Sequence, residues 1–191
     1  MDLHDFETDL LGKLRDARRL VVIGIGADLR EDDAVGNLLA RELIADIANN
    51  NHIRVNTNIE HSVDEYLKID GVLILNASVV PEQYITVVKD FGPDTIIIVD
   101  AAAMGNQSYP GDLAFVRTEE LDASTFSTHT ISLRYFIEIL NVFGLKARIF
   151  IIGIQPGKIG YGEGLSPAVA DTKVFLKSLL LRYLEQTLLK P

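Results

Sequence analysis

The residues of this chain that could do chemistry are acids and one histidine in three separate segments. The first segment, GIGADLREDDAVG, places Glu31, Asp32 and Asp33 in a row after a Gly-x-Gly turn. Asp100 ends the apolar run TIIIVD, and His129 lies in the segment FSTHTISL. Carboxylates and an imidazole are ligands that a divalent transition-metal ion accepts, so their convergence would make a metal site.

The Gly-x-Gly turn stands where a dinucleotide-binding loop would stand, but its residues argue against a nucleotide. The third glycine of such a loop lets the helix pack close to the strand, and Leu29 replaces it here. Carboxylates follow where a pyrophosphate needs backbone N–H groups free of negative charge. No nucleotide cofactor is therefore expected. Helix capping by Asp32 or Asp33 is the simpler alternative to a ligand role, although one cap needs only one carboxylate.

Asp100 and His129 each have a structural alternative as well. Asp100 could bond nearby loop amides, and His129 could be a solvated or capping residue in its Ser/Thr-rich turn. In open α/β sheets, however, ligands gather outside the carboxyl ends of the strands. If the strands before Asp33 and Asp100 are neighbours, the two carboxylates face one crevice.

Composition excludes several classes of function. The 191 residues include no cysteine, which excludes disulfides, zinc fingers, iron–sulfur clusters and thiol nucleophiles. The net charge of −9 argues against a nucleic-acid partner, which would need clustered Lys and Arg. No apolar run reaches the ~18 residues of a membrane span, and the charged N-terminal segment is not a signal peptide, so a cytoplasmic location is expected.

The elements that must position these residues alternate between strand and helix. Strands are expected at 19–25, 52–59, 71–77, 94–103, 113–118 and 147–154, and helices at 2–18, 33–50, 62–69, 81–91, 128–144 and 167–189. Ser166 is expected to cap the last helix, with Pro167 at its first position. The alternation predicts a single three-layer αβα domain over 1–191, with an open, mostly parallel twisted sheet and helices on both faces.

Four segments in order resemble those of the [NiFe]-hydrogenase maturation proteases, most closely the hydrogenase 3 (formate hydrogenlyase) type. They are GIGADLREDDAVG, IIIVDAAAMG with PGDL after it, STHTISLRYFI and GIQPGKIGYGEGLSPAV, and the resemblance covers roughly residues 20–185. It implies an endopeptidase that removes the C-terminal extension of a [NiFe]-hydrogenase large-subunit precursor after nickel insertion. It also implies that Asp33, Asp100 and His129 are the catalytic residues and contact nickel carried by the substrate, with Asp32 behind them or capping the helix.

This function is compatible with the residues present. With no Cys and no evident Ser–His–Asp arrangement, the chain offers no obvious covalent nucleophile. A metal-assisted cut remains, in which a divalent ion polarises the scissile carbonyl and acidifies a bound water. Whether the metal acts this way or only reports that maturation is complete stays open. The ligand types would also accept zinc.

The sequence departs from the family pattern at the loops. Ala27 replaces the family Asn after the Gly-x-Gly turn, and Ala34 replaces a Gly. Asn76, Ala77 and Ser78 stand where the family has Asp-Gly-Gly, and losing two glycines restricts the backbone angles available there. In the family this loop is linked to substrate choice, so the change leaves open which hydrogenase is the partner.

Two rival functions and two added segments follow from this reading. The chain could be a silent metal- or peptide-binding module whose altered 76–80 loop abolishes cutting, or a hydrolase with its own resident ion. The loops at 76–80 and 155–164 are expected to border the cleft and contact the substrate peptide.

The helix at 2–18 and a possible insertion at 52–70 are additions to the family pattern. Glu60 and His61 in the insertion could bind metal, although surface decoration is the favoured interpretation.

Overall fold

The computed structural model describes residues 2–50, 53, 60–62, 65–105, 107–118 and 129–189. They form a seven-stranded sheet in the order β2-β3-β4-β1-β5-β7-β6. The four central strands are parallel: β4 (Val72–Ser78), β1 (Leu20–Ile25), β5 (Thr95–Ala101) and β7 (Arg148–Ile154). The edges are antiparallel, through β2 (Glu60–Ser62) and β3 (Tyr66–Ile69) on one side and β6 (Leu113–Val116) on the other.

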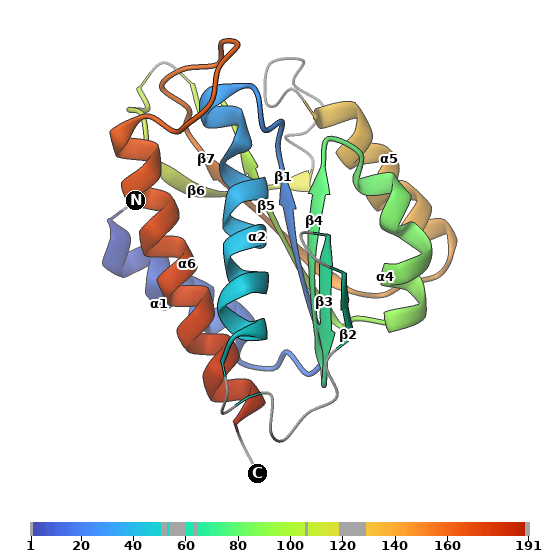
Figure 1. Cartoon of the computed structure of the whole chain (residues 1–191). Coiled ribbons are helices and arrows are strands. Elements are labelled where there is room, and N and C mark those ends of the chain that lie inside the picture. The colour runs from blue at the N-terminus through green and yellow to red at the C-terminus, as the bar shows by residue number, and fades with distance from the viewer. Residues whose placement is uncertain are drawn as a thin grey trace.

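Helices cover both faces of this sheet. In Figure 1, α1 (Leu3–Leu14), α2 (Val35–Ala48) and α6 (Pro167–Leu188) lie on one face, and α4 (Ile85–Phe91) and α5 (Thr130–Val142) lie on the other. Short 3-10 turns, η1 (Glu31–Ala34) and η2 (Pro81–Tyr84), lead into α2 and α4. The predicted single α/β domain, with a mostly parallel sheet between helices, is confirmed.

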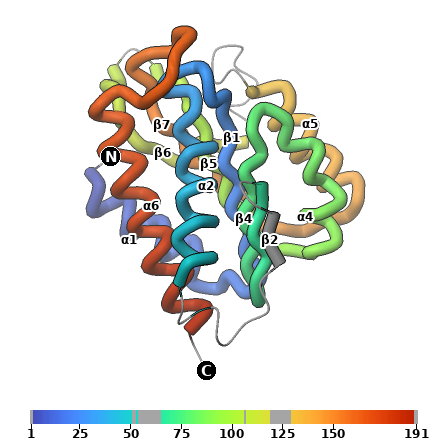
Figure 2. Tube along the Cα trace, in the orientation of Figure 1, coloured from blue at the N-terminus to red at the C-terminus, as the bar shows by residue number. Residues whose placement is uncertain are grey.

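Two hydrophobic clusters hold the layers together. The larger one packs the β-sheet against α1, α2 and α6, and the other packs the opposite face against α4 and α5. All six residues of β1 and all seven of β5 are buried, as expected for parallel strands covered on both sides. The Cα trace in Figure 2 shows α6 alongside α2, and Lys173 and Lys177 of α6 pair there with Glu42 of α2.

Two glycines set the distance between α2 and the sheet. A Cβ on Gly24 of β1 would lie 2.0 Å from the carbonyl oxygen of Gly36 in α2. A Cβ on Gly36 would lie 2.2 Å from the carbonyl oxygen of Val99 in β5 and 2.4 Å from that of Ile25. Real side chains do not fit at such separations, so only glycine allows α2 to pack this close to β1 and β5.

The segment around 62–69 differs from the prediction. The helix expected there is wrong: Tyr66–Ile69 is strand β3, antiparallel to β4. Leu67 and Ile69 are buried while Lys68 between them is exposed, which is the two-residue period of a strand. The strand expected at 52–59 lies outside the described residues, except for Ile53, which is helical.

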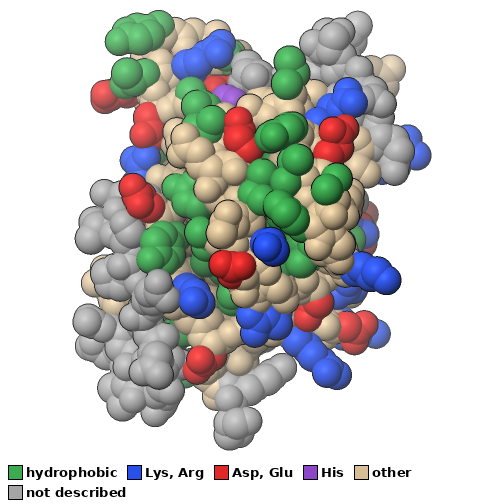
Figure 3. Space-filling view, turned by 90° about the vertical axis from the view of Figure 1, so that its right-hand side faces the viewer, with side chains coloured by type: hydrophobic (Ala, Val, Ile, Leu, Met, Phe, Trp, Pro, Cys, Tyr) green, Lys and Arg blue, Asp and Glu red, His purple; other side chains and the backbone are tan. Residues whose placement is uncertain are grey.

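The surface over α4 and α5 carries many hydrophobic side chains (Figure 3). On α5, Ile131 is 85% exposed and Val142 is 79% exposed, with Tyr135 half exposed between them. None of the helices built from the described residues combines the length and the apolarity that a bilayer crossing requires.

Candidate metal-contacting site

Asp33 and His129 meet at the carboxyl end of the sheet. Asp33 lies in η1, the next element after β1, and His129 is the residue before the first turn of α5. The Nε2 atom of His129 lies 3.2 Å from Oδ2 of Asp33, although the residues are 96 positions apart in the chain. Both side chains are buried, with exposed fractions of 1% for Asp33 and 7% for His129. They form an ion pair when the imidazole is protonated.

Asp100 lies at the same edge of the sheet. It is the sixth residue of β5, which pairs in parallel with β1, so the condition that the two strands be neighbours is met. Its side chain is fully buried. The negative charge of Asp100 acts on the imidazole of His129, since it is one of the groups that raise the pKa of that ring.

The protonation of His129 is set by opposing influences. Burial on its own would lower the pKa of the imidazole, because it disfavours the charged form. The hydrogen bond with Asp33 and the charges of Asp100 and Asp33 outweigh burial and the opposing charge of Arg30, so the pKa is raised. The imidazole therefore lies among negatively charged groups, which favour its protonated form or another cation beside it.

Asp32 has a different role from its neighbour. Its side chain is fully buried and accepts hydrogen bonds from the backbone N–H groups of Gly157, Lys158 and Ser166. The hydroxyl of Ser166 also donates to it, at 2.8 Å. Burial alone would raise the pKa of Asp32, but these hydrogen bonds outweigh it and lower the pKa. The ionised form of Asp32 is thus favoured, and its carboxylate fixes the 155–166 segment.

The predicted capping roles are corrected by these contacts. Ser166 occupies the N-cap position of α6, but its side chain does not bond the helix amides. Its hydroxyl donates to Asp32 instead, because that buried carboxylate needs donors more than the solvent-facing helix end does. The N-cap positions of η1 and α2 are occupied by Arg30 and Ala34, so neither Asp32 nor Asp33 is an N-cap residue.

Glu31 completes the explanation for three acids in a row. Its carboxylate accepts from the N–H of Gly160, and its own N–H donates to the carbonyl of Gly162. Glu31 has a φ of 51°, in the left-handed region, which turns the chain so that successive side chains face different partners. Two of the acids therefore hold the glycine-rich loop, and the third contacts His129.

Of the predicted loop at 76–80, Asn76, Ala77 and Ser78 are the last residues of strand β4, and residues 79–80 connect that strand to η2. We call this segment the 76–80 loop; it lies close to Asp33. The carbonyl oxygen of Ser78 accepts from the N–H of Gly26, at 2.9 Å. Gly26 in turn packs on Asp33 so closely that a Cβ there would lie 2.1 Å from the Asp33 carbonyl oxygen. Ser78 has a φ of 50°, where the family pattern has glycine, so it adopts a backbone conformation that glycine would adopt more easily.

An open hollow of about 640 Å³ lies beside the opening turn. It is lined by residues of that turn, of α2 and of the predicted 155–164 loop: Asp28, Leu29, Leu38, Arg41, Glu163 and Gly164.

The ligand predictions have different outcomes. The structure brings Asp33 and His129 together and places the Asp100 charge near them. Within the described part of the chain, no three His, Asp or Glu side chains are arranged to hold an ion jointly. Glu60 and His61 lie in β2, but their side chains are outside the described part, so a ligand pair there stays a prediction.

Sequence reasoning missed Asn37, which lies in the first turn of α2 and is 1% exposed. Its side chain joins Asp28 to the backbone of Ser78. The only signal for it in the sequence is an amide side chain at a buried position of an otherwise apolar helix face, among Val35, Leu39 and Ala40.

Comparison with known proteins supports the resemblance seen in the motifs. A family model described as HycI, hydrogenase maturation protease, matches residues 57–182, which include Asp100 and His129. A Methanocaldococcus jannaschii protein provisionally named hydrogenase maturation protease is 31% identical over 152 residues, 80% of each chain. The hydrogenase 3 maturation protease of Escherichia coli K12 is 24% identical over 152 residues, 79% of this chain and 81% of that protein.

A solved structure matches over nearly the whole chain. The [NiFe] hydrogenase maturation protease HycI from Thermococcus kodakarensis superposes with a TM-score of 0.71 at 27% identity. The match covers 93% of this chain and 99% of that one.

Proposed function

Because this chain belongs to the HycI family of hydrogenase maturation proteases, we propose that it cuts the large-subunit precursor of a [NiFe] hydrogenase. The cut removes a C-terminal extension after nickel has been inserted, and we expect it to take place in the cytoplasm. One observation carries the proposal: Asp33 and His129 are in direct contact although they come from distant segments, and the charge of the buried Asp100, from a third segment, acts on the same imidazole.

The separation of Asp33 and His129 suits two ligands of one ion. Imidazole nitrogen and carboxylate oxygen bind divalent ions at about 2.0–2.2 Å, so two such ligands at usual angles lie about 3.0–3.4 Å apart. The observed 3.2 Å falls in this range. Nickel carried by the precursor could therefore replace the proton between the two groups with little movement, and Asp100 would add a second negative charge.

The same pair could assist hydrolysis. In a metal-assisted cut, water attacks the scissile carbonyl carbon while the substrate's own ion polarises the carbonyl oxygen. This role is an alternative to metal binding by the same atoms: with the ion held by the precursor alone and His129 deprotonated, the Asp33–His129 pair could take the proton that this water loses and return it to the leaving amine, as a general base and then a general acid. The products are a new carboxylate on the large subunit and the released peptide.

The surface around the site supports docking of a large protein partner. The exposed apolar residue Ile131 stands two positions after His129, and Tyr135 follows one turn later on α5. On the other side, the 76–80 loop is one hydrogen bond from Gly26, next to Asp33. A precursor that reaches His129 would therefore contact apolar side chains of α5 and the altered loop.

The direct test is incubation of the protein with a nickel-loaded large-subunit precursor. We expect a mobility shift of the precursor on a denaturing gel and release of a peptide of the mass of the C-terminal extension. Precursor without nickel is the control and should stay uncut. Mass spectrometry of the peptide gives the scissile bond.

Two other outcomes identify the rival functions. A stable complex with uncut, nickel-loaded precursor would mean that the chain is a binding module. Stoichiometric metal in the purified protein, with no precursor present, would mean a hydrolase with a resident ion.

A further inference from the structure

Three side chains at four-residue spacing link the candidate site to the altered loop. Asp33 precedes α2, and Asn37 and Arg41 follow one and two turns later. Residues four apart lie on the same face of an α-helix, so Asn37 and Arg41 share one side of α2, and Asp33 lies just before that helix in η1. Asp33 contacts His129, whereas Asn37 and Arg41 make contacts outside the candidate site.

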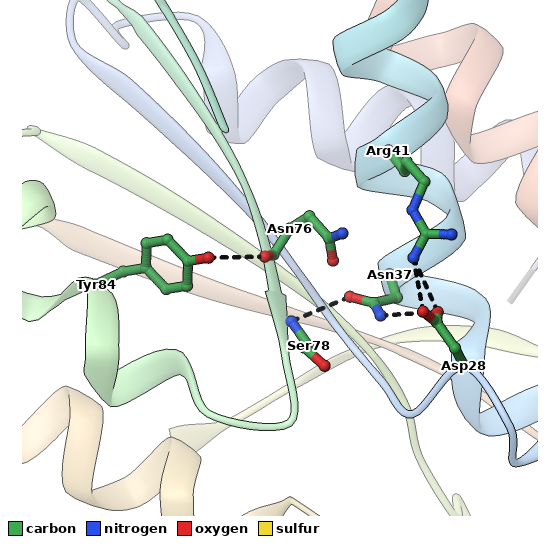
Figure 4. Close-up of polar contacts among 6 residues, drawn as sticks. All are labelled: Asp28, Asn37, Arg41, Asn76, Ser78 and Tyr84. Carbon is green, nitrogen blue, oxygen red and sulfur yellow. Dashed lines mark hydrogen bonds and ion pairs between the residues drawn. The ribbon is translucent and has the colours of Figure 1, made fainter. Parts of the chain in front are cut away.

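Asn37 joins this face of α2 to the 76–80 loop (Figure 4). Its Oδ1 accepts from the backbone N–H of Ser78 at 3.1 Å, and its Nδ2 donates to Oδ1 of Asp28 at 3.0 Å. Arg41 then binds both oxygens of Asp28 through one amino group, at 3.0 and 2.8 Å. We call this series of contacts, from Ser78 through Asn37 and Asp28 to Arg41, the clamp.

The orientation of the Asn37 amide is fixed by its partners. A backbone N–H can only donate and an ionised carboxylate can only accept, so the oxygen must face Ser78 and the nitrogen must face Asp28. Asn37 is buried, so neither contact is readily replaced by water. Val, Leu or Ile at position 37 could make neither contact.

The 76–80 loop needs contacts that fix its backbone because Ser78 has an unfavourable backbone conformation. Ser78 is in the left-handed region, which costs free energy for any residue with a Cβ, so the backbone there must be fixed by bonds from outside the loop. Two such bonds reach Ser78: the N–H of Gly26 binds its carbonyl, and Asn37 binds its N–H. Gly26 rests on Asp33, so both bonds tie the loop to the segment that carries Asp33.

We infer that Asn37 is a positioning residue that holds the 76–80 loop at a fixed place beside Asp33, and that it determines which precursor the site accepts. Only the second part of this inference, the choice of precursor, rests on the proposed function. We expect the loop to border the cleft that receives the precursor, so loss of the clamp should weaken precursor binding more than it slows the cut. Asn37 itself contacts neither the metal nor the peptide.

The first test compares Asn37→Leu with a matched control, Asn50→Leu. Asn50 makes the same type of bond, to a carboxylate oxygen of Glu185 at 2.9 Å, just beyond the other end of α2. We expect Asn37→Leu to speed amide hydrogen exchange of Ser78 about tenfold and to raise KM for the precursor about tenfold, with kcat changed less than about threefold. Asn50→Leu should leave Ser78 exchange and KM unchanged.

The second test exchanges the two polar groups of the clamp. Asn37→Asp alone places a carboxylate against Asp28, and we expect it to raise KM about tenfold or more. The double change Asp28→Asn/Asn37→Asp restores one donor and one acceptor in the opposite order, and the new carboxylate at position 37 stays one turn from Arg41. We expect KM within about threefold of the wild-type value for the double variant.

The results separate the inference from the proposed function. Unchanged Ser78 exchange in Asn37→Leu, or a double variant no better than Asn37→Asp alone, overturns the clamp. A fall in kcat with KM unchanged would make Asn37 a structural residue and also overturn its role in selection. If the wild-type protein cuts no precursor, the proposed function fails, and Ser78 exchange alone decides whether the clamp exists.

Discussion

Asp32 and Asp33 are adjacent and both fully buried, yet the regions around them treat the two charges in opposite ways. Asp32 is surrounded by backbone N–H groups and one hydroxyl, from Gly157, Lys158 and Ser166. Asp33 instead faces an imidazole, a group that can gain or lose a proton. A charge among fixed donors stabilises structure, whereas a charge beside a titratable group can exchange that proton for another cation.

The largest expected effect is that of an Asp33 substitution on processing of the precursor. Asp33→Asn keeps the size of the side chain and removes the charge that faces His129. We expect precursor processing to fall by about 10³-fold or more, as for a group that contacts the reacting atoms, with the free energy of unfolding changed by about 1 kcal/mol or less. Gel assays and urea unfolding measure the two quantities. Asp100→Ala and His129→Ala should also stop processing, and normal cutting by all three variants would refute the site assignment.

For Asp32 we expect the reverse of the Asp33 result, a large effect on stability and a small effect on processing. Asp32→Asn replaces an acceptor oxygen by an amide nitrogen, which then meets N–H groups that also donate. We expect the free energy of unfolding to fall by about 3 kcal/mol, since hydrogen bonds to a buried charge are lost. The processing rate per folded molecule should fall less than about tenfold. A variant as stable as the wild type would show that Asp32 does not fix the 155–166 segment.

The pH dependence of stability should separate the two regions by sign. The pKa of Asp32 is lowered in the folded protein, so its stabilising contribution is present above the ordinary carboxyl pKa of about 3.9 and is lost as the pH falls. The pKa of His129 is raised, so its contribution is complete below the ordinary value of about 6.5 and is lost as the pH rises through the raised value.

Thermal unfolding over a range of pH checks both signs. The stability difference between wild type and Asp32→Asn should shrink in acid, and the difference between wild type and His129→Ala should shrink in alkali. Nickel-dependent binding of the precursor should strengthen as the pH rises, because the ion must displace the proton of His129. Precursor binding that is strongest in acid would contradict this competition.

The smallest effect is expected far from both acids. Lys177 of α6 pairs with Glu42 and Asp46 of α2 on the surface, which raises the pKa of Lys177. The hydrogen bond with Asp46 raises this pKa most, and the hydrogen bond with Glu42 adds to it. Burial of the ammonium group acts in the opposite direction. We expect Lys177→Met to change the free energy of unfolding by about 0.5 kcal/mol and processing not at all.

The parts of the fold that were predictable from the sequence are those fixed by local pattern. An apolar run ending in an acid placed Asp100 near the carboxyl end of a buried strand, and a Gly-x-Gly turn after another buried strand placed Asp33 beyond the carboxyl end of its neighbour; the two strands are indeed neighbours. The alternation of strands and helices gave the layered architecture. The segment Tyr66–Ile69 was misread because four residues carry too little period to distinguish a strand from a helix, and its pairing with β4 decides the outcome.

The contacts that were not predictable are those between distant residues. Asn37 bonds to Ser78, 41 positions away, and Ser166 bonds to Asp32, 134 positions away. A sequence shows that Ser166 stands at a helix start, but not that a buried carboxylate will compete with the helix for its hydroxyl. The polar clamp and the role of Asp32 therefore emerge only when the chain is folded.

The close approach of α2 to the sheet has a consequence for how this protein could lose its activity. A single methyl group at position 36 would collide with the Val99 and Ile25 carbonyls and push the helix outward. Asp33 and Asn37 flank that position, so both would be displaced together from His129 and from the loop. A Gly36→Ala protein could then fold and still be inert, with every reactive group intact.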